Sequence, residues 1–436
     1  MTAAISTTDL ISMLQDARSR THELIDDLDQ QQMIGPKLGT VNPLLWEIGH
    51  IAYFYEYFIL RQLYGRQSLL GNQRADALYD SISIPHETRW DLPLLSIADT
   101  RHYMQSVLDS LCERLQAPVA SAQDSFIYRF GVFHEDMHTE AFLWGRQTLG
   151  YPTPRFANAV DMSAERAAGA HRGFVEVPGG KFRLGAEPTA DFMFDNEKFA
   201  HTVEVKPFTI AKAPVSNAEF AEFVAAGGYH RDQYWCADGL LWKQQRQSAH
   251  PGYWIADGSG NWLMRRFDQT MALPENEAVS HINWYEANAY CRWAGLRLPT
   301  ELEWEAAALG EKNADGSLSI NKRRYPWGDA IQPGFANLDG RALGCVDVAA
   351  FADGDSAFGC RQMLGNVWEW TSDSFQPYPG FCADAYADYS RPLFGSTKVL
   401  RGGAWTSRSR MLHGTYRNFF GPERWDIFSG FRTCKP

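Results

Sequence analysis

The character of the chain changes near residue 150, and this change constrains the fold more than any other feature. Residues 8 to about 150 carry apolar side chains at the three-to-four-residue spacing of amphipathic helices. From Gly173 onward, short strand-like runs are separated by glycine, proline and tryptophan. We interpret residues 156–173 as a linker between these parts. The sequence therefore predicts a helical domain, residues 1–155, followed by an α+β domain, residues 174–436.

Four helices are predicted in the first domain. The first follows capping residues near Thr8 and runs to about Asp29, and the second begins at Pro43, because proline suits a first helical turn. The third begins at Asp99 or Thr100, and the fourth spans residues 125–149. Four such helices form a bundle, which commonly builds a metal site from side chains on facing helices.

Two histidines on the fourth helix form the first candidate site. His134 and His138 are four residues apart, so both imidazoles leave one helix face and can bind one metal ion. His50, in an apolar stretch of the second helix, is the best candidate for a third ligand. Glu47 and Glu140 are candidates to support these histidines, although a solvent-exposed position fits both equally well.

Composition excludes several classes of protein. A chain of 436 residues can form two or three domains, and its net charge of -11, without a basic stripe, argues against nucleic acid as a partner. Seven scattered cysteines without a CxxC pair indicate reduced thiols rather than a disulfide framework. The start of the chain does not look like a signal peptide, and no apolar run is long enough to span a membrane. We therefore expect a cytoplasmic protein without a membrane partner.

Short motifs carry a resemblance to known families. Segments of the second domain resemble formylglycine-generating enzymes, whose fold is C-type-lectin-like: 195–198 (DNEK), 214–217 (PVSN), 284–287 (WYEA), 297–305 (RLPTELEWE), 365–370 (GNVWEW) and 400–403 (LRGG). The first domain, with His50 and the HxxxHxE pattern from His134, resembles DinB-like metal-binding bundles. Joined in this order, the two resemble the sulfoxide synthases of ergothioneine biosynthesis over essentially the whole chain.

The resemblance implies a cofactor, substrates and site residues. The cofactor is a mononuclear non-haem iron(II) bound by three histidines that match His50, His134 and His138, and the substrates are O₂ and hercynine, the trimethylammonium betaine of histidine. Asn418 and Phe419 match residues that face hercynine, where relatives commonly carry Asn-Trp. The pair at positions 386 and 389 is similar to two tyrosines near the iron, so Tyr386 or Tyr389 is expected to donate a proton. Aromatic faces also suit the quaternary ammonium of hercynine.

The resemblance is weakest around the sulfur donor. Relatives that use γ-glutamylcysteine place an aspartate and paired arginines there, whereas this chain has Phe420, and Arg424 followed by Trp425. Met137 stands where some relatives have a glutamine. Flat aromatic faces suit a neutral ring, as in the similar selenoneine synthases, which join a selenosugar to hercynine. Arg89 and other arginines can still bind a carboxylate, so a thiol donor, γ-glutamylcysteine or cysteine, stays open.

Other classes of function fit less of the chain. A formylglycine-type protein oxidase uses a closely placed cysteine pair, but Cys360, Cys382 and Cys434 are far apart in sequence. A DinB-type zinc thiol transferase leaves the second domain without a role, and a non-catalytic lectin-like module gives the three histidines none. We therefore expect an iron-dependent oxygenase that forms a C–S or C–Se bond at the imidazole C2 of hercynine.

Overall fold

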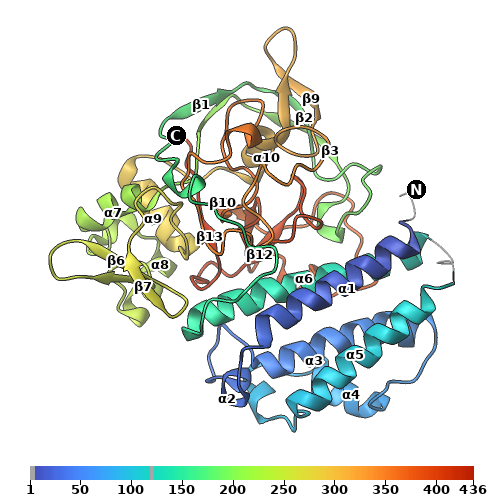
Figure 1. Cartoon of the computed structure of the whole chain (residues 1–436). Coiled ribbons are helices and arrows are strands. Elements are labelled where there is room, and N and C mark those ends of the chain that lie inside the picture. The colour runs from blue at the N-terminus through green and yellow to red at the C-terminus, as the bar shows by residue number, and fades with distance from the viewer. Residues whose placement is uncertain (1–4, 118–121) are drawn as a thin grey trace. The chain divides into compact units, whose positions relative to one another are not determined.

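The computed structural model describes residues 5–117 and 122–436 and divides into two compact units, residues 1–156 and 157–436 (Figure 1). Unit 1 is helical, and unit 2 combines short strands, helices and long irregular segments. The prediction of a helical bundle followed by an α+β domain is thus confirmed. None of the helices in the described part of the chain is long and apolar enough to cross a membrane.

Unit 1 is built on four long helices with two short helices between them. Its α-helices are α1 (Thr7–Ile25), α2 (Gln30–Ile34), α3 (Leu44–Tyr55), α4 (Asn72–Tyr79), α5 (Ile97–Arg114) and α6 (Ala122–Leu149). A π-helix, Glu56–Leu63, continues α3, and a 3-10 helix, His86–Asp91, lies before α5. The expected long connection from about residue 65 to 98 therefore contains α4 and this 3-10 helix.

Capping residues explain where two of the predicted boundaries shift. The first helix stops at Ile25 rather than near Asp29, because Asp29 forms a capping box with Gln32 that starts α2. The third begins at Ile97, because the Ser96 side chain accepts a hydrogen bond from the Asp99 backbone N–H. Local hydrogen bonds thus set these ends more sharply than the apolar spacing does.

Helices α3 and α6 run through the interior of unit 1. Every residue of α3 is buried. On α6, Glu135, Asp136 and Glu140 are buried, while Met137 is only half-buried. The Glu135 carboxylate accepts hydrogen bonds from Arg18 Nε at 3.0 Å and Thr21 Oγ1 at 2.7 Å, so this buried charge is paired. Hydrophobic spacing alone cannot predict such an inward-facing charge.

Unit 2 contains several small sheets and four α-helices among the described residues. The strands are β1 (Phe174–Val177), β2 (Gly180–Leu184), β3 (His201–Val205), β4 (Phe208–Ala211), β5 (Trp254–Ala256), β6 (Trp262–Arg266), β7 (Gln269–Ala272), β8 (Gly310–Lys312), β9 (Leu318–Lys322), β10 (Trp368–Ser374), β11 (Lys398–Arg401), β12 (Asn418–Phe420) and β13 (Ser429–Gly430). The largest sheet has the order β12-β11-β10-β13, and β13 runs parallel to β10.

The helices of unit 2 are α7 (Asn217–Ala225), α8 (Ala237–Arg246), α9 (Trp284–Ala294) and α10 (Glu301–Leu309). We expected α7 and α9 from the sequence and missed α8 and α10. Thr300 and Glu303 form a capping box at the start of α10, and this T-x-x-E signal is present in the sequence.

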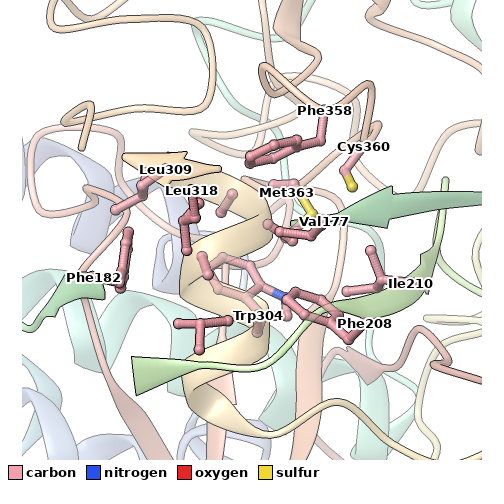
Figure 2. Packing of buried hydrophobic residues seen from close by; sticks show 14 of the residues in the cluster. Val177, Phe182, Phe208, Ile210, Trp304, Leu309, Leu318, Phe358, Cys360 and Met363 are labelled. Carbon is pink, nitrogen blue, oxygen red and sulfur yellow. The ribbon is translucent and has the colours of Figure 1, made fainter. Parts of the chain in front are cut away.

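Helix α10 lies at the centre of the core of unit 2. Trp304 on this helix packs among buried residues of β1, β2 and β4, including Val177, Phe182 and Phe208 (Figure 2). Two carboxylates on the same helix are buried and paired: Arg401 donates to Glu301 Oε1 and to Glu305 Oε2, both at 2.7 Å. The RLPTE and LRGG motifs therefore meet in a buried ion-pair network that holds the core together.

The segment expected to be a linker is packed into unit 2. Met162 is buried with Ala342, Val346 and Ala350, and the Val160 N–H donates to the Arg341 carbonyl at 3.0 Å. A buried methionine and a backbone hydrogen bond make this segment part of the domain surface rather than a free connection.

All seven cysteines are free thiols, as the sequence predicts. Four of them, Cys291, Cys345, Cys360 and Cys434, are buried, and Cys382 is exposed.

Candidate metal centre and substrate-binding residues

Three histidines converge in the interior of unit 1. His50 lies on α3, and His134 and His138 lie on α6; one nitrogen from each lies within 4.8 Å of the others. The ring centroids are 5.2 Å apart for His50 and His134, 5.1 Å for His50 and His138, and 4.5 Å for His134 and His138. Among the described residues, no other group of three or more His, Cys, Asp or Glu side chains comes together in this way.

The spacing of the ring nitrogens fits one metal ion. His134 Nε2 and His138 Nε2 are 3.3 Å apart. A metal ion that makes bonds of about 2.0–2.1 Å to nitrogen would fit within reach of both atoms. The donor set therefore suits a divalent transition metal.

Hydrogen bonds hold the Nδ1 atoms of two of the three histidines. His50 Nδ1 donates to the Tyr79 carbonyl at 2.8 Å, and His138 Nδ1 pairs with Glu47 Oε1 at 2.7 Å. A metal-binding histidine usually makes this kind of bond, because it fixes the tautomer and the ring direction. Glu47, one of the two supporting carboxylates considered from the sequence, thus bonds to a histidine.

Burial keeps two of these imidazoles neutral. Burial lowers the pKa of His50 to about 3, with a further contribution from the neighbouring His138. Burial also lowers the pKa of His134 well below its usual value, and His138 and His50 act in the same direction. Neutral imidazole is the form that binds a metal, so both side chains are ready to act as ligands at neutral pH.

Aromatic rings surround the three imidazoles. Trp46 stacks on His50 with centroids 5.0 Å apart and planes 7° apart, and Phe54 stacks on His134 at 3.7 Å and 12°. Met137, the neighbour of His138, is half-buried. These apolar surfaces limit the access of water to the imidazole cluster.

Arg89 contacts Trp46 instead of extending into solvent. Its guanidinium carbon lies 3.9 Å above the centroid of the Trp46 ring, and it donates to Asn42 Oδ1 at 2.8 Å and to the carbonyls of Ser81 and Ile84 at 3.4 Å. The residue expected to bind a substrate carboxylate is therefore held by several groups of unit 1.

The two candidate tyrosines lie in an aromatic cluster of unit 2. The Tyr389 hydroxyl is 3.4 Å from the Tyr416 hydroxyl, and the Tyr386 and Tyr389 rings are 6.4 Å apart. Phe194 stacks on Tyr389 at 5.0 Å, and Phe419 meets its edge at 5.6 Å. Burial, together with Tyr416, raises the pKa of Tyr389 above its usual range, so this hydroxyl keeps its proton at neutral pH.

Strand β12 separates the expected hercynine-binding residues onto two faces. Asn418 and Phe420 lie on one face, and Phe419 on the other, because successive side chains of a strand alternate. Phe419 stacks on the buried Phe375 at 4.2 Å. This packing gives Phe419 a structural role, whereas Asn418 and Phe420 share a face.

The residues expected around the donor already contact protein groups. Arg424 Nε and Nη2 donate to the two oxygens of Asp426 at 2.7 and 2.6 Å, and the Arg424 guanidinium carbon lies 5.1 Å above the centroid of the Phe420 ring. The guanidinium carbon of Arg246 lies 4.1 Å above the centroid of the Trp425 ring. The Arg424 guanidinium thus already has a bidentate carboxylate partner.

The DNEK motif, residues 195–198, forms hydrogen bonds to the segments that carry the candidate tyrosines and Asn418. We did not predict this role. Asp195 accepts a hydrogen bond from Ser390 Oγ at 2.5 Å, and Lys198 donates one to Asp384 Oδ1 at 2.5 Å. Ser390 and Asp384 belong to the segment that contains Tyr386 and Tyr389. The motif also contacts the segment before Asn418, through His413 and Thr415 bonded to Glu197 at 2.8 Å and Arg417 bonded to the Asn196 carbonyl at 2.7 Å. The spacing of this motif revealed a family likeness but not these partners.

Comparison with known proteins matches both units. The DinB superfamily matches residues 13–142, and the sulfatase-modifying factor enzyme 1-like domain matches residues 160–436. Hercynine oxygenase of Mycolicibacterium smegmatis is 36% identical over 95% of this chain and 96% of its own length. Hercynine oxygenase of Mycolicibacterium thermoresistibile is 37% identical over 97% of this chain and 94% of its own length.

Formylglycine-generating enzymes match a smaller part of the chain. The enzyme of Streptomyces coelicolor is 33% identical over 57% of this chain and 81% of its own length. The hercynine oxygenases, in contrast, match nearly the whole chain, including the helical unit that brings the three histidines together. The chain therefore belongs to the hercynine oxygenase family, and the fold and the enzyme class expected from its sequence are confirmed.

Proposed function

We propose that this protein is an iron(II)-dependent oxygenase that forms a carbon–sulfur or carbon–selenium bond at the imidazole C2 of hercynine. The observation that carries the proposal is the convergence of His50, His134 and His138 in a chain whose relatives over both units are named hercynine oxygenases.

The choice of iron rests on the reaction class. Three neutral imidazoles bind either zinc or iron(II), so the ligand set alone selects neither. Zinc has no redox chemistry, whereas an oxygenase must activate O₂. Bound iron(II) would supply the electrons and open coordination positions that this activation requires.

The protein side chains hold the ligands and keep water away. Glu47 would fix the ring of His138 and increase its basicity, and the Tyr79 carbonyl would do the same for His50. The rings of Trp46 and Phe54, stacked on His50 and His134, would shield the metal from bulk water.

Residues of unit 2 would bind hercynine. Asn418 is the polar candidate, and the cluster around Tyr389 offers the aromatic faces that a trimethylammonium group prefers. A Tyr389 hydroxyl that keeps its proton at neutral pH could donate it during the reaction, with Tyr416 as hydrogen-bond partner; Tyr386 is the second candidate donor. Arg89 and Met137 of unit 1 are proposed to contact the donor instead of hercynine.

For the donor, we favour a neutral molecule such as a selenosugar over γ-glutamylcysteine or cysteine. An amino acid donor needs charged partners, but Phe420 supplies no charge and Arg424 already pairs with Asp426. Trp425 adds an aromatic surface, although one that Arg246 already contacts. Losing one charge-assisted bond costs about 1.5–3 kcal/mol, roughly 10- to 150-fold in affinity.

The metal assignment is tested by alanine substitution. Each of His50→Ala, His134→Ala and His138→Ala should remove iron and product formation together. His102→Ala, at an exposed position on α5, is the matched control and should retain both. Full iron occupancy in all three ligand variants would contradict the assignment.

The substrate and donor are tested in one reaction. Protein reconstituted anaerobically with iron(II) is mixed with hercynine and equal concentrations of selenosugar and γ-glutamylcysteine, then exposed to O₂, and the products are separated by mass spectrometry. We expect the selenium product to equal or exceed the sulfur product. A dominant sulfur product would refute the donor proposal, and the absence of any hercynine-derived product would refute the reaction.

A further inference from the structure

Two side chains of α3 donate hydrogen bonds to the end of α4. Trp46 Nε1 donates to the Leu78 carbonyl and His50 Nδ1 donates to the Tyr79 carbonyl, both at 2.8 Å. Trp46 and His50 are four residues apart, so they leave the same face of α3. Two neighbouring carbonyls at the end of α4 therefore accept hydrogen bonds from two side chains on the same face of α3.

The end of α4 is well suited to accept these bonds. Helix α4 ends at Tyr79, and the last carbonyls of a helix have no partner within the helix. They also carry the negative end of the helix dipole, which favours donors such as an indole or imidazole N–H. The Tyr79 carbonyl thus determines which nitrogen of His50 keeps its proton, while the Leu78 carbonyl holds the Trp46 ring that stacks on it.

Gly49 allows this close approach of α4 to α3. A Cβ atom at position 49 would lie 2.2 Å from Cε1 and 2.4 Å from Cζ of Tyr79, far inside van der Waals contact. Glycine within a helix costs about 1 kcal/mol relative to alanine. A glycine next to His50 is therefore explained by the space that Tyr79 requires.

Arg89 also contacts the Trp46 ring. Its guanidinium lies over the Trp46 ring at 3.9 Å, while the Trp46 ring is nearly parallel to His50. Arg89 also bonds to the carbonyls of Ser81 and Ile84, which follow α4 in the chain. The guanidinium thus connects the segment after α4 to the ring that stacks on His50.

We propose that Trp46, Gly49 and Arg89 are positioning residues that, with the end of α4, fix the tautomer and direction of the His50 ring for metal binding. This proposal rests on the proposed metal role of His50. Without the bond to the Tyr79 carbonyl, the imidazole could rotate and present the protonated nitrogen to the metal. Groups that orient a metal-binding histidine typically change metal affinity 10- to 100-fold.

The decisive experiment measures Co(II) affinity, because Co(II) reports coordination by its visible absorption spectrum. Gly49→Ala in the full chain should weaken Co(II) binding at least tenfold and change the spectrum to one with fewer nitrogen ligands. Gly145→Ala is the matched control: it is also a buried glycine in a long helix, but its added Cβ would meet Leu44 at an acceptable 3.7 Å. This control should bind Co(II) as the wild type does.

A second substitution separates positioning from general damage to the fold. Tyr79→Leu removes the ring atoms that meet the new Cβ but keeps the backbone carbonyl that accepts from His50. The variant Gly49→Ala/Tyr79→Leu should therefore regain most of the lost affinity and the wild-type spectrum, although two substitutions in the core lower its stability. Failure of this rescue, with Tyr79→Leu alone binding Co(II) normally, would refute the proposal.

The Trp46 and Arg89 contributions are tested in the same assay. Trp46→Phe keeps a stacked ring but loses the bond to Leu78, Trp46→Leu loses both, and Arg89→Met loses the cation above the ring. We expect affinity to fall in the order wild type, Trp46→Phe, Trp46→Leu, and Arg89→Met to weaken binding without loss of folding by circular dichroism. Equal affinity in all variants would refute the positioning role, whereas normal Co(II) binding by His50→Ala would refute the proposed metal site itself.

Discussion

Replacing Glu47 should weaken metal binding in proportion to the charge that is lost beside His138. The Glu47 side chain is 4% exposed, and its Oε1 lies 2.7 Å from His138 Nδ1. Glutamine keeps the size and an oxygen acceptor but removes the charge, whereas alanine removes the bond. Loss of a partner behind a metal-binding histidine typically costs 10- to 100-fold in affinity. We therefore expect about tenfold weaker binding for Glu47→Gln and about 100-fold for Glu47→Ala.

These factors agree with the strength of the bond itself. A 10- to 100-fold change corresponds to about 1.4–2.7 kcal/mol, and a hydrogen bond to a charged group contributes about 1.5–3 kcal/mol. The alanine value is therefore reached only if nearly all of the bond strength is transmitted to the metal through the imidazole. A smaller effect would mean that Glu47 orients His138 but does little to its basicity.

The assay is anaerobic competition for Fe(II) or Co(II) between the protein and a coloured chelator. Glu56→Gln is the matched control, because Glu56 is another buried carboxylate of unit 1 and accepts from Tyr103, Ser68 and the Leu69 N–H. This control should lower the free energy of unfolding and leave metal affinity unchanged. Equal metal affinities for Glu47→Gln, Glu47→Ala and the wild type would refute the role of Glu47.

Three further predictions concern the stability of unit 2 and the part of the chain that binds hercynine. Arg432→Met should lower the free energy of unfolding by about 3–5 kcal/mol in guanidinium chloride, because it leaves Glu369 buried without its bidentate partner; Arg183→Met, at a surface pair, should cost less than about 1 kcal/mol. Burial lowers the pKa of His281 to about 3. The unfolded chain therefore takes up the proton first, and through this residue the folded state loses about 1.4 kcal/mol of stability per pH unit as the pH falls from about 6.5 to about 3. His281→Asn should reduce the slope of stability against pH by this amount, measured by urea unfolding at several pH values, while the buried His50 and His134 continue to contribute in the same direction; an unchanged slope would refute the contribution of His281. The fragment of residues 1–156 should show no hercynine binding by calorimetry, because the proposed betaine-binding residues follow residue 156; measurable affinity would contradict this.

Spacing in the sequence was sufficient to predict a helical bundle in which His50, His134 and His138 converge, while their binding of a metal stays a prediction. The HxxxH pair needs only helical periodicity, and His50 stands in a mostly apolar helical segment. Glu47 could be named but not preferred over Glu140, because the choice depends on how α3 is rotated against α6. The bond between His50 and Tyr79 was not predictable, since it depends on the end of α4, a short helix within an apparent loop.

The motifs of unit 2 predicted the fold better than the site. Residues of the RLPTELEWE and LRGG motifs hold the core together. Arg401 forms buried ion pairs with Glu301 and Glu305, and Trp304 packs in the hydrophobic core. Family likeness therefore came from residues that hold the core together. The residues expected around the donor, Phe420 and Trp425, lie outside these motifs, and their side-chain partners could be known only from the structure.

The distribution of thiols determines which cysteine an oxidant can reach. Burial raises the pKa of Cys345 to about 12 and that of Cys360 to about 11, so neither forms the thiolate that oxidants attack. The exposed Cys382 lies two residues before Asp384, which pairs with Lys198, and four before Tyr386. Oxidants released near the protein should modify this thiol first. A fluorophore attached there would report movements of the tyrosine-bearing segment when substrate binds, while the buried thiols stay unlabelled.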